Sequence, residues 1–304
     1  MKSITSILIA LVCVLFLSCA KEEGINPDET ECLLYNYIMD TNYYESPCFN
    51  PNNADEFIFV HKNFYTGEKI LYKYRISTNE KDLIYKGDIL EQPDWGEQDW
   101  ILLTLNINHK NLWLIKSNGD SLTQITFNNE NYKATFIDQS SKIALAGEDY
   151  TTKIIDLEGN LLDVINLNSV HPVDHNFTTN TYAFTHVVQI HTVKLNGDTI
   201  SHRYYDIEGG LKITSNCQWI NDWELIFATQ TGIYKLNTET KEKTRIRFHD
   251  EPTQYIHLDY SWISNKLIMQ KTEQKEIGDK LIEVKSIIVL MATDGTNRQE
   301  IEIR

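Results

Sequence analysis

The chain has 304 residues, of which 41% are hydrophobic and 11% aromatic, enough apolar material for one large all-β domain or two smaller domains. Its formal net charge at pH 7 is −15. Such acidity excludes nucleic acid as an expected partner, because phosphates would be repelled and no stripe of Lys and Arg offsets the charge.

The N-terminus has the pattern of an export signal. Lys2 supplies a positive charge, and residues 7–17 form a mostly apolar run that is shorter than the ~20 residues of a membrane-spanning helix. The run ends at Leu17-Ser18-Cys19, which resembles the cleavage site of bacterial lipoproteins, although Phe16 stands where that family usually has Leu. The resemblance implies that residues 1–18 are removed and that Cys19 carries lipid. The alternative is an ordinary signal peptide with an incidental cysteine.

Residues 19–46 are expected to contain the acylated cysteine, a polar tether and an aromatic N-terminal arm. Lys21-Glu22-Glu23 resembles the short acidic tags of surface-exposed lipoproteins of Bacteroidota. Export also implies an oxidising compartment, in which disulfides are permitted. Cys32 and Cys48 are the plausible pair, and the alternative is that both are buried free thiols.

From residue 47 onward the sequence repeats. A strand-like segment led by an aromatic residue recurs at intervals of 46, 41, 41, 42 and 43 residues. These lead aromatics are Phe49, Trp95, Phe136, Phe177, Trp219 and Trp262. A period in the forties that contains strands is typical of propeller blades.

Apolar strands and polar turns keep phase with the lead aromatics. The second strand of each repeat is expected at residues 57–61, 100–106, 142–147, 182–188, 224–229 and 266–271. The turns after the third strands contain Gly and Asn, which tolerate the positive φ of tight hairpins. One such sheet cannot bury both of its faces, whereas sheets stacked around an axis can. We therefore expect residues 47–304 to form an all-β, six-bladed β-propeller of four-stranded antiparallel blades.

Two repeats are longer than the others. Residues 189–200 and 272–285 are expected to lengthen the hairpin between the second and third strands of their blades. The extra length is either harmless elongation, which costs little free energy, or a raised wall beside a binding site.

The second repeat resembles a known family. Pro93-Asp94-Trp95, residues 112–115 and residues 118–126 are similar to the TolB-type, or tryptophan-aspartate-like, propeller repeat. Gly96-Glu97-Gln98-Asp99 replaces the Ser-Pro-Asp-Gly of that family, and the chain has no room for the α/β domain that precedes the TolB propeller. The resemblance implies the fold but not membership of the Tol system.

Histidines and carboxylates concentrate in the segments that lead into the inner strands. In a propeller these segments line one mouth of the central channel. The candidate ligand-binding residues are Asp94, His171, Asp174, His175, His257 and Asp259. Three interpretations stay open: polar loops, a ligand-binding mouth, or a metal or acid–base site. No G-x-S-x-G, Walker A or G-x-G-x-x-G motif occurs, so we expect neither a cofactor nor a metal.

These observations predict a protein of the cell envelope, lipid-anchored in the outer membrane through Cys19. We expect it to bind a protein, a peptide or a glycan without catalysis. The first alternative is a glycan-directed hydrolase that uses His and carboxylate side chains at the channel mouth. The second is a purely structural component of the envelope.

Overall fold

A computed structural model describes residues 43–63, 66–127, 133–146, 151–167, 169–196, 199–207, 211–249, 253–277 and 280–303. The signal peptide predicted at residues 1–18, the lipidated Cys19 and the proposed disulfide partner Cys32 lie outside these residues. Within them the regular secondary structure is β-strand throughout. No helix of the described part of the chain is long and apolar enough to cross a membrane.

Four groups of consecutive strands each form a separate antiparallel four-stranded sheet, which we name after its first strand. The β5 blade contains β5 (Asp94–Trp95), β6 (Trp100–Ile107), β7 (His109–Lys116) and β8 (Thr123–Gln124). The β9 blade contains β9 (Lys133–Ile137), β10 (Lys142–Ala146), β11 (Thr152–Asp156) and β12 (Leu161–Ile165). The β13 blade contains β13 (Asp174–Asn176), β14 (Thr181–His186), β15 (Gln189–Asn196) and β16 (Thr199–Asp206). The β17 blade contains β17 (Gln218–Trp219), β18 (Glu224–Thr229), β19 (Gly232–Asn237) and β20 (Lys243–Phe248).

The remaining eight strands form one sheet from the two ends of the described chain. The β1 unit contains β1 (Tyr43–Asn50), β2 (Asn53–Lys62), β3 (Lys69–Arg75) and β4 (Glu80–Gly87). The β21 unit contains β21 (Thr253–Ser261), β22 (Lys266–Ile277), β23 (Lys280–Ala292) and β24 (Gln299–Ile301). Both units are antiparallel internally, and the parallel pairing of Tyr43 with Ser286 joins them.

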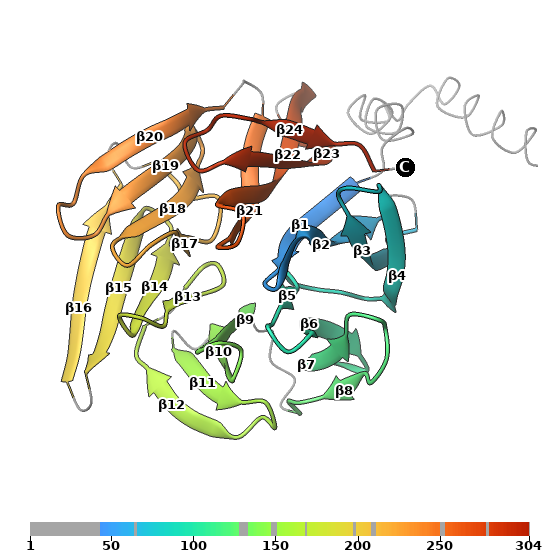
Figure 1. The fold of residues 1–304 in the computed structure, drawn as a ribbon, viewed down its shortest axis with the longest axis horizontal. Coiled ribbons are helices and arrows are strands. Elements are labelled where there is room, and N and C mark those ends of the chain that lie inside the picture. Colours follow the sequence, from blue (N-terminus) through green and yellow to red (C-terminus); the bar gives the residue numbers. More distant parts are fainter. Residues whose placement is uncertain are drawn as a thin grey trace, which may run out of the picture.

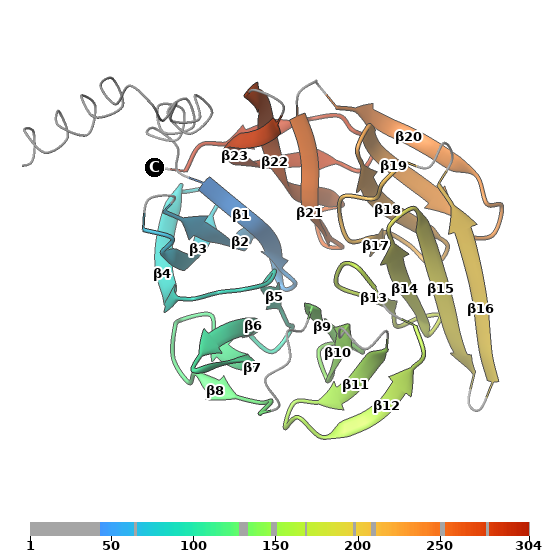
Figure 2. The same cartoon turned by 180° about the vertical axis from the view of Figure 1, so that it is seen from behind.

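The sheets stand around a common centre like the blades of a propeller (Figure 1), and the view from behind shows the same arrangement (Figure 2). The inner strands β1, β5, β9, β13, β17 and β21 lie nearest the centre. The C-terminal segment meets the start of the fold, since the Tyr44 hydroxyl donates to the Ile303 carbonyl at 3.3 Å. The predicted all-β propeller with four-stranded antiparallel blades is therefore confirmed.

The hydrophobic core lies between neighbouring sheets rather than within one of them. Leu102 and Leu114 of the β5 blade, for example, pack in one cluster with Ile143 and Phe136 of the β9 blade. The lead aromatic Trp95 packs in the wedge between its own blade and the β1 unit, with Ile58 and Leu71, and is only 4% exposed. We call its position on each inner strand the wedge position and the side chain there the wedge residue. Burying apolar surface between adjacent sheets holds the ring together at about 25 cal/mol per Å².

The turn glycines have a second role beside their positive φ. A Cβ on Gly159, whose φ is +88°, would lie 2.1 Å from the Ile125 carbonyl oxygen that follows β8. Gly119 and Gly295 approach the backbone of the preceding unit in the same way, at Ile84 and Ile246. These turns pack directly against neighbouring backbone, which a side chain would prevent.

The structure corrects two of the predicted lead aromatics. Phe177 and Trp262 are 57% and 59% exposed, so neither fills a wedge between sheets. His175 and Tyr260 occupy the wedge position instead, because they pair with Tyr182 and Leu267 as Trp95 pairs with Ile101. The predicted aromatics lie two residues further along and reach the loops beyond the inner strands.

Of the two predicted hairpin extensions, the structure confirms one and contradicts the other. In the β21 unit, β22 and β23 are both extended, as predicted for residues 272–285. In the β13 blade the prediction was wrong, because residues 189–196 are the third strand and residues 199–206 the fourth. The apolar pair Val187-Val188 lies in the turn between β14 and β15, so the apolar run concealed the reversal of the chain.

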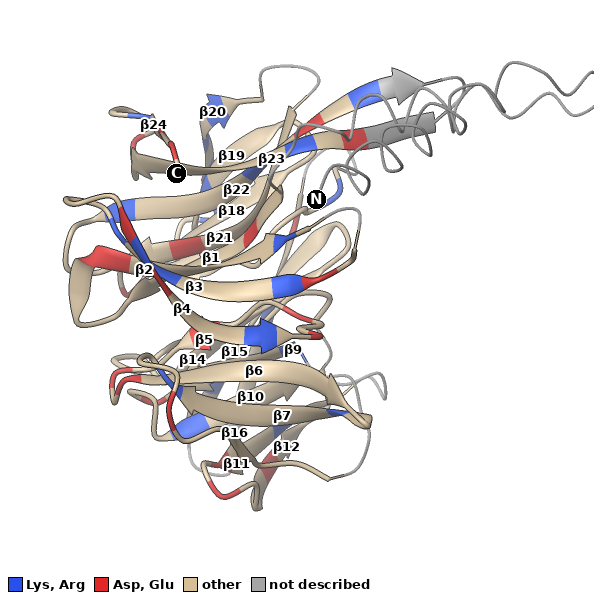
Figure 3. Cartoon of the chain, turned by 90° about the vertical axis from the view of Figure 1, so that its right-hand side faces the viewer, with Lys and Arg blue, Asp and Glu red and all other residues tan. Residues whose placement is uncertain are grey.

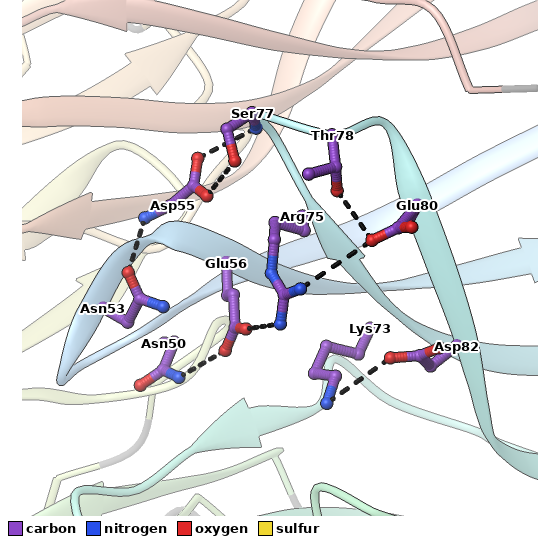
Figure 4. Close-up of polar contacts among 10 residues, drawn as sticks. All are labelled: Asn50, Asn53, Asp55, Glu56, Lys73, Arg75, Ser77, Thr78, Glu80 and Asp82. Carbon is purple, nitrogen blue, oxygen red and sulfur yellow. Dashed lines mark hydrogen bonds and ion pairs between the residues drawn. The ribbon is translucent and has the colours of Figure 1, made fainter.

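Charged residues of both signs are interspersed along the strands (Figure 3). On the β1 unit they form cross-strand pairs (Figure 4): Arg75 lies 2.9 Å from Glu56 and 3.7 Å from Glu80, and Lys73 lies 3.6 Å from Asp82. Exposed pairs of this kind each contribute less than about 1 kcal/mol. They make the edges of the sheet soluble rather than holding the fold together.

Candidate functional site

The predicted carboxylates occupy one repeated position, the residue directly before the wedge residue of each inner strand. Its occupants in chain order are Cys48, Asp94, Thr135, Asp174, Gln218 and Asp259, as the pairing of inner and second strands shows. Aspartate therefore alternates with an uncharged residue from one inner strand to the next. We call these positions the axial ring.

Each aspartate of the axial ring accepts a hydrogen bond from the backbone of the next inner strand. Asp94 accepts from the Phe136 N–H at 2.6 Å and Asp174 from the Trp219 N–H at 2.6 Å. Asp259 accepts from the Phe49 N–H at 2.7 Å and so ties the end of the repeat array to its beginning. Hydrogen bonds to a charged acceptor contribute roughly 1.5–3 kcal/mol.

Burial disfavours the ionised form of these carboxyl groups. Burial, with a smaller contribution from the negative charge of Asp94, raises the pKa of Asp259 to about 7 and that of Asp174 to about 6. The pKa of Asp94 is raised by burial too, although hydrogen bonds from Phe136 and Thr135 act in the opposite direction. Burial, followed by the charges of Asp259 and Asp94, also raises the pKa of the Cys48 thiol.

The space between these side chains is small. Cys48, Asp94, Thr135 and Asp259 line it together with Gln92, whose Oε1 is buried without a hydrogen-bond partner among the described residues. The volume open to the centre of a water molecule is about 10 Å³, which is room for roughly one water. A sugar ring or a peptide therefore does not fit between the aspartates, whereas a water that donates to Gln92 does.

The predicted histidines have separate environments. His175 stacks on Tyr182 with ring centroids 4.4 Å apart, and its Nδ1 accepts from the Asp138 N–H at 3.2 Å. Its Nε2 therefore carries the proton and donates to Asn180 Oδ1 at 3.1 Å. Burial lowers the pKa of His175, so the ring is a neutral wedge between two sheets.

His257 and His171 are also held neutral. His257 Nδ1 lies 2.7 Å from Gln270 Oε1 and 3.1 Å from the Ser46 hydroxyl. Because an amide oxygen only accepts, Nδ1 is the donor to Gln270. Burial lowers the pKa of His257, and burial together with the charges of His257 and Lys133 lowers that of His171 to about 3. Over the described ranges, no three His, Cys, Asp or Glu side chains are grouped so that they could hold a metal ion.

The structure thus brings Asp94, Asp174 and Asp259 together at the axis and leaves the three histidines apart from them. Ligand binding by these six residues stays a prediction. Cys48 is a buried thiol whose Sγ lies 3.5 Å from Asp94 Oδ1.

A set of exposed apolar side chains on the loops was not predicted. Phe177, Trp223, Trp262 and Ile263 are 57%, 50%, 59% and 59% exposed. They lie on the loops that join the inner to the second strands of the β13 blade, the β17 blade and the β21 unit, and we call them the loop face. The first two loops are in contact, because the Asn176 side-chain amide donates to the Asn221 carbonyl at 3.2 Å.

A scan against protein-family models and a search of the curated proteins found no match. Solved structures do match, and they show a β-propeller. A putative TolB from Agrobacterium tumefaciens is 14% identical with a TM-score of 0.52, and the match covers 75% of this chain and 86% of that one. The Cps50 β-propeller domain of Myceliophteria thermophila is 8% identical with a TM-score of 0.54, over 76% and 94% of the two chains.

A chain of a nidogen/laminin complex is also similar. It is 10% identical with a TM-score of 0.53, and the match covers 67% of this chain and 79% of that chain. Identities this low establish the shared fold alone. The predicted TolB-like propeller is confirmed at that level.

Proposed function

We propose that this protein is a non-catalytic binding module of the cell envelope whose loop face binds a protein partner. The observation that carries the proposal is the loop face itself. Its four large apolar side chains are each at least half exposed and lie on loops of three successive units. Large exposed apolar side chains that gather on one set of loops mark interaction sites, and Trp is enriched among the residues that dominate binding energy.

The charge of the chain narrows the chemistry of the partner. Asp222 precedes Trp223 on the loop face, and the chain as a whole carries a net charge of −15. Complementary interfaces place positive potential against negative potential. The proposed partner is therefore a protein with an apolar patch surrounded by Lys and Arg. The similarity to a chain of the nidogen/laminin complex supports a protein as the partner, since that chain comes from an assembly of two proteins.

The proposal includes a closed ring and an anchor. The β1 and β21 units count as two blades that meet through one parallel pairing, so that the ring has six blades and runs from Tyr43 of β1 to Ile301 of β24. Residues 1–18 are a lipoprotein signal peptide, and Cys19 is the acylated residue that holds the protein at the outer membrane through the segment that precedes β1. The apolar run before Leu17-Ser18-Cys19 and the TolB-like fold support the envelope location.

One observation favours the alternative of a glycan-directed hydrolase. The raised pKa values of Asp174 and Asp259 resemble that of a general acid. The space beside Asp94 and Asp259 has room for about one water, which favours the binding module. Hydrolysis of envelope glycans that is lost in a Asp174→Asn, Asp259→Asn double variant would establish the alternative.

The test begins with cross-linking of the full lipidated protein in native envelope to identify the partner. The affinity of the purified partner is then measured for wild type and for a Trp223→Ala, Trp262→Ala double variant. We expect at least a tenfold loss of affinity, because each such residue contributes more than about 1 kcal/mol.

The matched control is a Leu161→Ala, Leu162→Ala double variant. These residues are 60% and 50% exposed but lie on the outer strand β12. The control should bind within about twofold of wild type. Equal affinity of the Trp223, Trp262 variant and the control would refute the loop face as the binding surface.

A further inference from the structure

A second space lies between the β13 and β17 blades, away from the axial ring. Its volume is about 150 Å³, far more than the space at the axis. Hydroxyl groups of Thr181, Thr192 and Ser201 line one wall, and Trp219 and Asp222 belong to the opposite blade. We call it the interblade pocket.

The internal repeat shows why this pocket exists. In the β5 blade, Leu102 pairs with Leu114, and both pack against Phe136, the wedge residue of the next blade. In the β21 unit, Ile268 pairs with Leu290 and both pack with the wedge residue Phe49. Large apolar side chains fill the gap between sheets at both places.

The β13 blade has small or polar residues at the same positions. Ala183 pairs with Thr192, where the β5 blade and the β21 unit have Leu–Leu and Ile–Leu pairs, the β9 blade has Ala–Ile, and the β1 unit and the β17 blade have Ile–Lys. Each of those five pairs contains at least one large apolar residue, and the pair of the β13 blade contains none. Thr181 likewise stands where the β5 blade has Trp100, since each pairs with a lysine of the third strand. The gap before Trp219 therefore stays open and is lined with hydroxyl groups.

Trp219 supplies an independent sign that a ligand belongs there. Its side chain is 2% exposed and lines the pocket, and its Nε1–H is buried without a hydrogen-bond partner among the described residues. A buried donor without an acceptor costs free energy, so each such group in a native protein calls for a water, an ion or a ligand. A ligand oxygen in the interblade pocket would accept this hydrogen.

The lining indicates an uncharged ligand. Its charged residues are two basic and two acidic, Lys194, Arg203, Asp222 and Glu239. Arg203 and Glu239 already lie 3.7 Å apart as an ion pair. No net charge remains for a charged ligand to neutralise, while the hydroxyl groups can both donate and accept.

We propose that the interblade pocket binds a neutral polyhydroxylated molecule of about the size of one sugar residue. The indole N–H of Trp219 donates to one of its oxygens, and Thr181, Thr192 and Ser201 exchange hydrogen bonds with its hydroxyl groups. The site contains none of the four apolar side chains of the loop face, although Asp222 of its lining precedes Trp223. It neither needs the protein partner nor depends on the proposed function.

The test uses glucose, galactose, mannose and N-acetylglucosamine as probes, with alanine and glutamate as zwitterionic and charged comparisons. Binding to the full-length protein is measured by saturation-transfer NMR and isothermal titration calorimetry. We expect at least one sugar, and neither amino acid, to bind saturably. Absence of saturable sugar binding, or binding of the amino acids only, would overturn the proposal.

Two substitutions within the pocket locate the binding. Thr192→Leu restores the residue found at this position in the β5 blade and should abolish sugar binding, because it fills the cavity. Trp219→Phe keeps a wedge aromatic but removes the N–H donor, and should weaken binding about twofold to tenfold. Thermal unfolding verifies that each variant is folded. If one of the two variants does not fold, the sugar affinity of the other one tests the site.

The matched control is Trp95→Phe, at the same repeat position in the β5 blade. It should leave sugar affinity unchanged, and so should the Trp223→Ala, Trp262→Ala variant of the loop face. Wild-type sugar affinity in both pocket variants would refute the assignment, whatever happens at the loop face.

Discussion

Replacement of Asp259 by Asn should change the pH dependence of stability in a defined way. Asp259 accepts the Phe49 N–H at 2.7 Å, and burial raises its pKa from the usual 3.8 to about 7. Asn keeps an oxygen that can accept the same hydrogen bond, and the water space at the axis can serve its amide group. The substitution therefore removes the buried charge while preserving the tie to Phe49.

The sign and size follow from proton linkage. Between these two pKa values the folded protein binds more protons at Asp259 than the unfolded chain does, so stability falls as the pH rises. A difference of about three pKa units corresponds to about 4 kcal/mol when both states are ionised. Integration of the linkage from pH 5 to pH 8 gives a loss of about 2–3 kcal/mol from this one group.

We therefore expect Asp259→Asn to be more stable than wild type at pH 8 and to lose most of that advantage at pH 5. Urea unfolding of both proteins across this pH range measures the effect. Asp259→Ala is the control, because it also removes the buried charge but leaves the Phe49 N–H unpaired; it should be about 1–3 kcal/mol less stable than Asp259→Asn at both pH values. The same pH dependence in wild type and Asp259→Asn would refute the argument that burial controls this carboxylate.

Three further predictions concern the turns, the aromatics and the anchor. Gly159→Ala should lower the free energy of unfolding by about 2–4 kcal/mol, because its Cβ would lie 2.1 Å from the Ile125 oxygen at a φ of +88°. A free energy of unfolding within about 1 kcal/mol of wild type, measured by thermal unfolding, would contradict this. Trp95→Ala and Trp219→Ala should each cost about 3–5 kcal/mol in denaturant unfolding, whereas the exposed Trp262→Ala should cost less than about 0.5 kcal/mol. Cys19→Ala should move the protein from the membrane fraction to the soluble fraction, with a Cys13→Ala variant, which keeps the predicted lipidation site, as control; unchanged membrane association would refute lipidation at Cys19.

The fold could be predicted because the repeat is strongly marked. Trp95, Phe136 and Trp219 precede strands of similar spacing, and the turns contain residues that suit tight hairpins. The exact wedge residue was harder to predict, because Tyr260 and Trp262 point to the same side of an extended chain. Only the pairing of Tyr260 with Leu267 decides between them.

The axial carboxylates could be located but their environment could not be inferred. Their placement before the wedge residue is a sequence property, whereas the hydrogen bond that the Trp219 N–H donates to Asp174 joins residues 45 positions apart. The interblade pocket was not predicted for a similar reason. It depends on Ala183, Thr192 and Trp219 coming together, and each is an ordinary strand residue when considered alone.

The internal repeat supplies its own controls for separating structure from function. The axial ring keeps a regular alternation, with Asp94, Asp174 and Asp259 each tied to the next inner strand, as expected of residues that hold the ring together. Departures from the repeat that add no stability need another explanation. The open gap before Trp219 and the exposed Trp223 and Trp262 are such departures, and they fall on neighbouring units. This concentration favours the side formed by the β13 blade, the β17 blade and the β21 unit, rather than the axis, as the part of the molecule that binds.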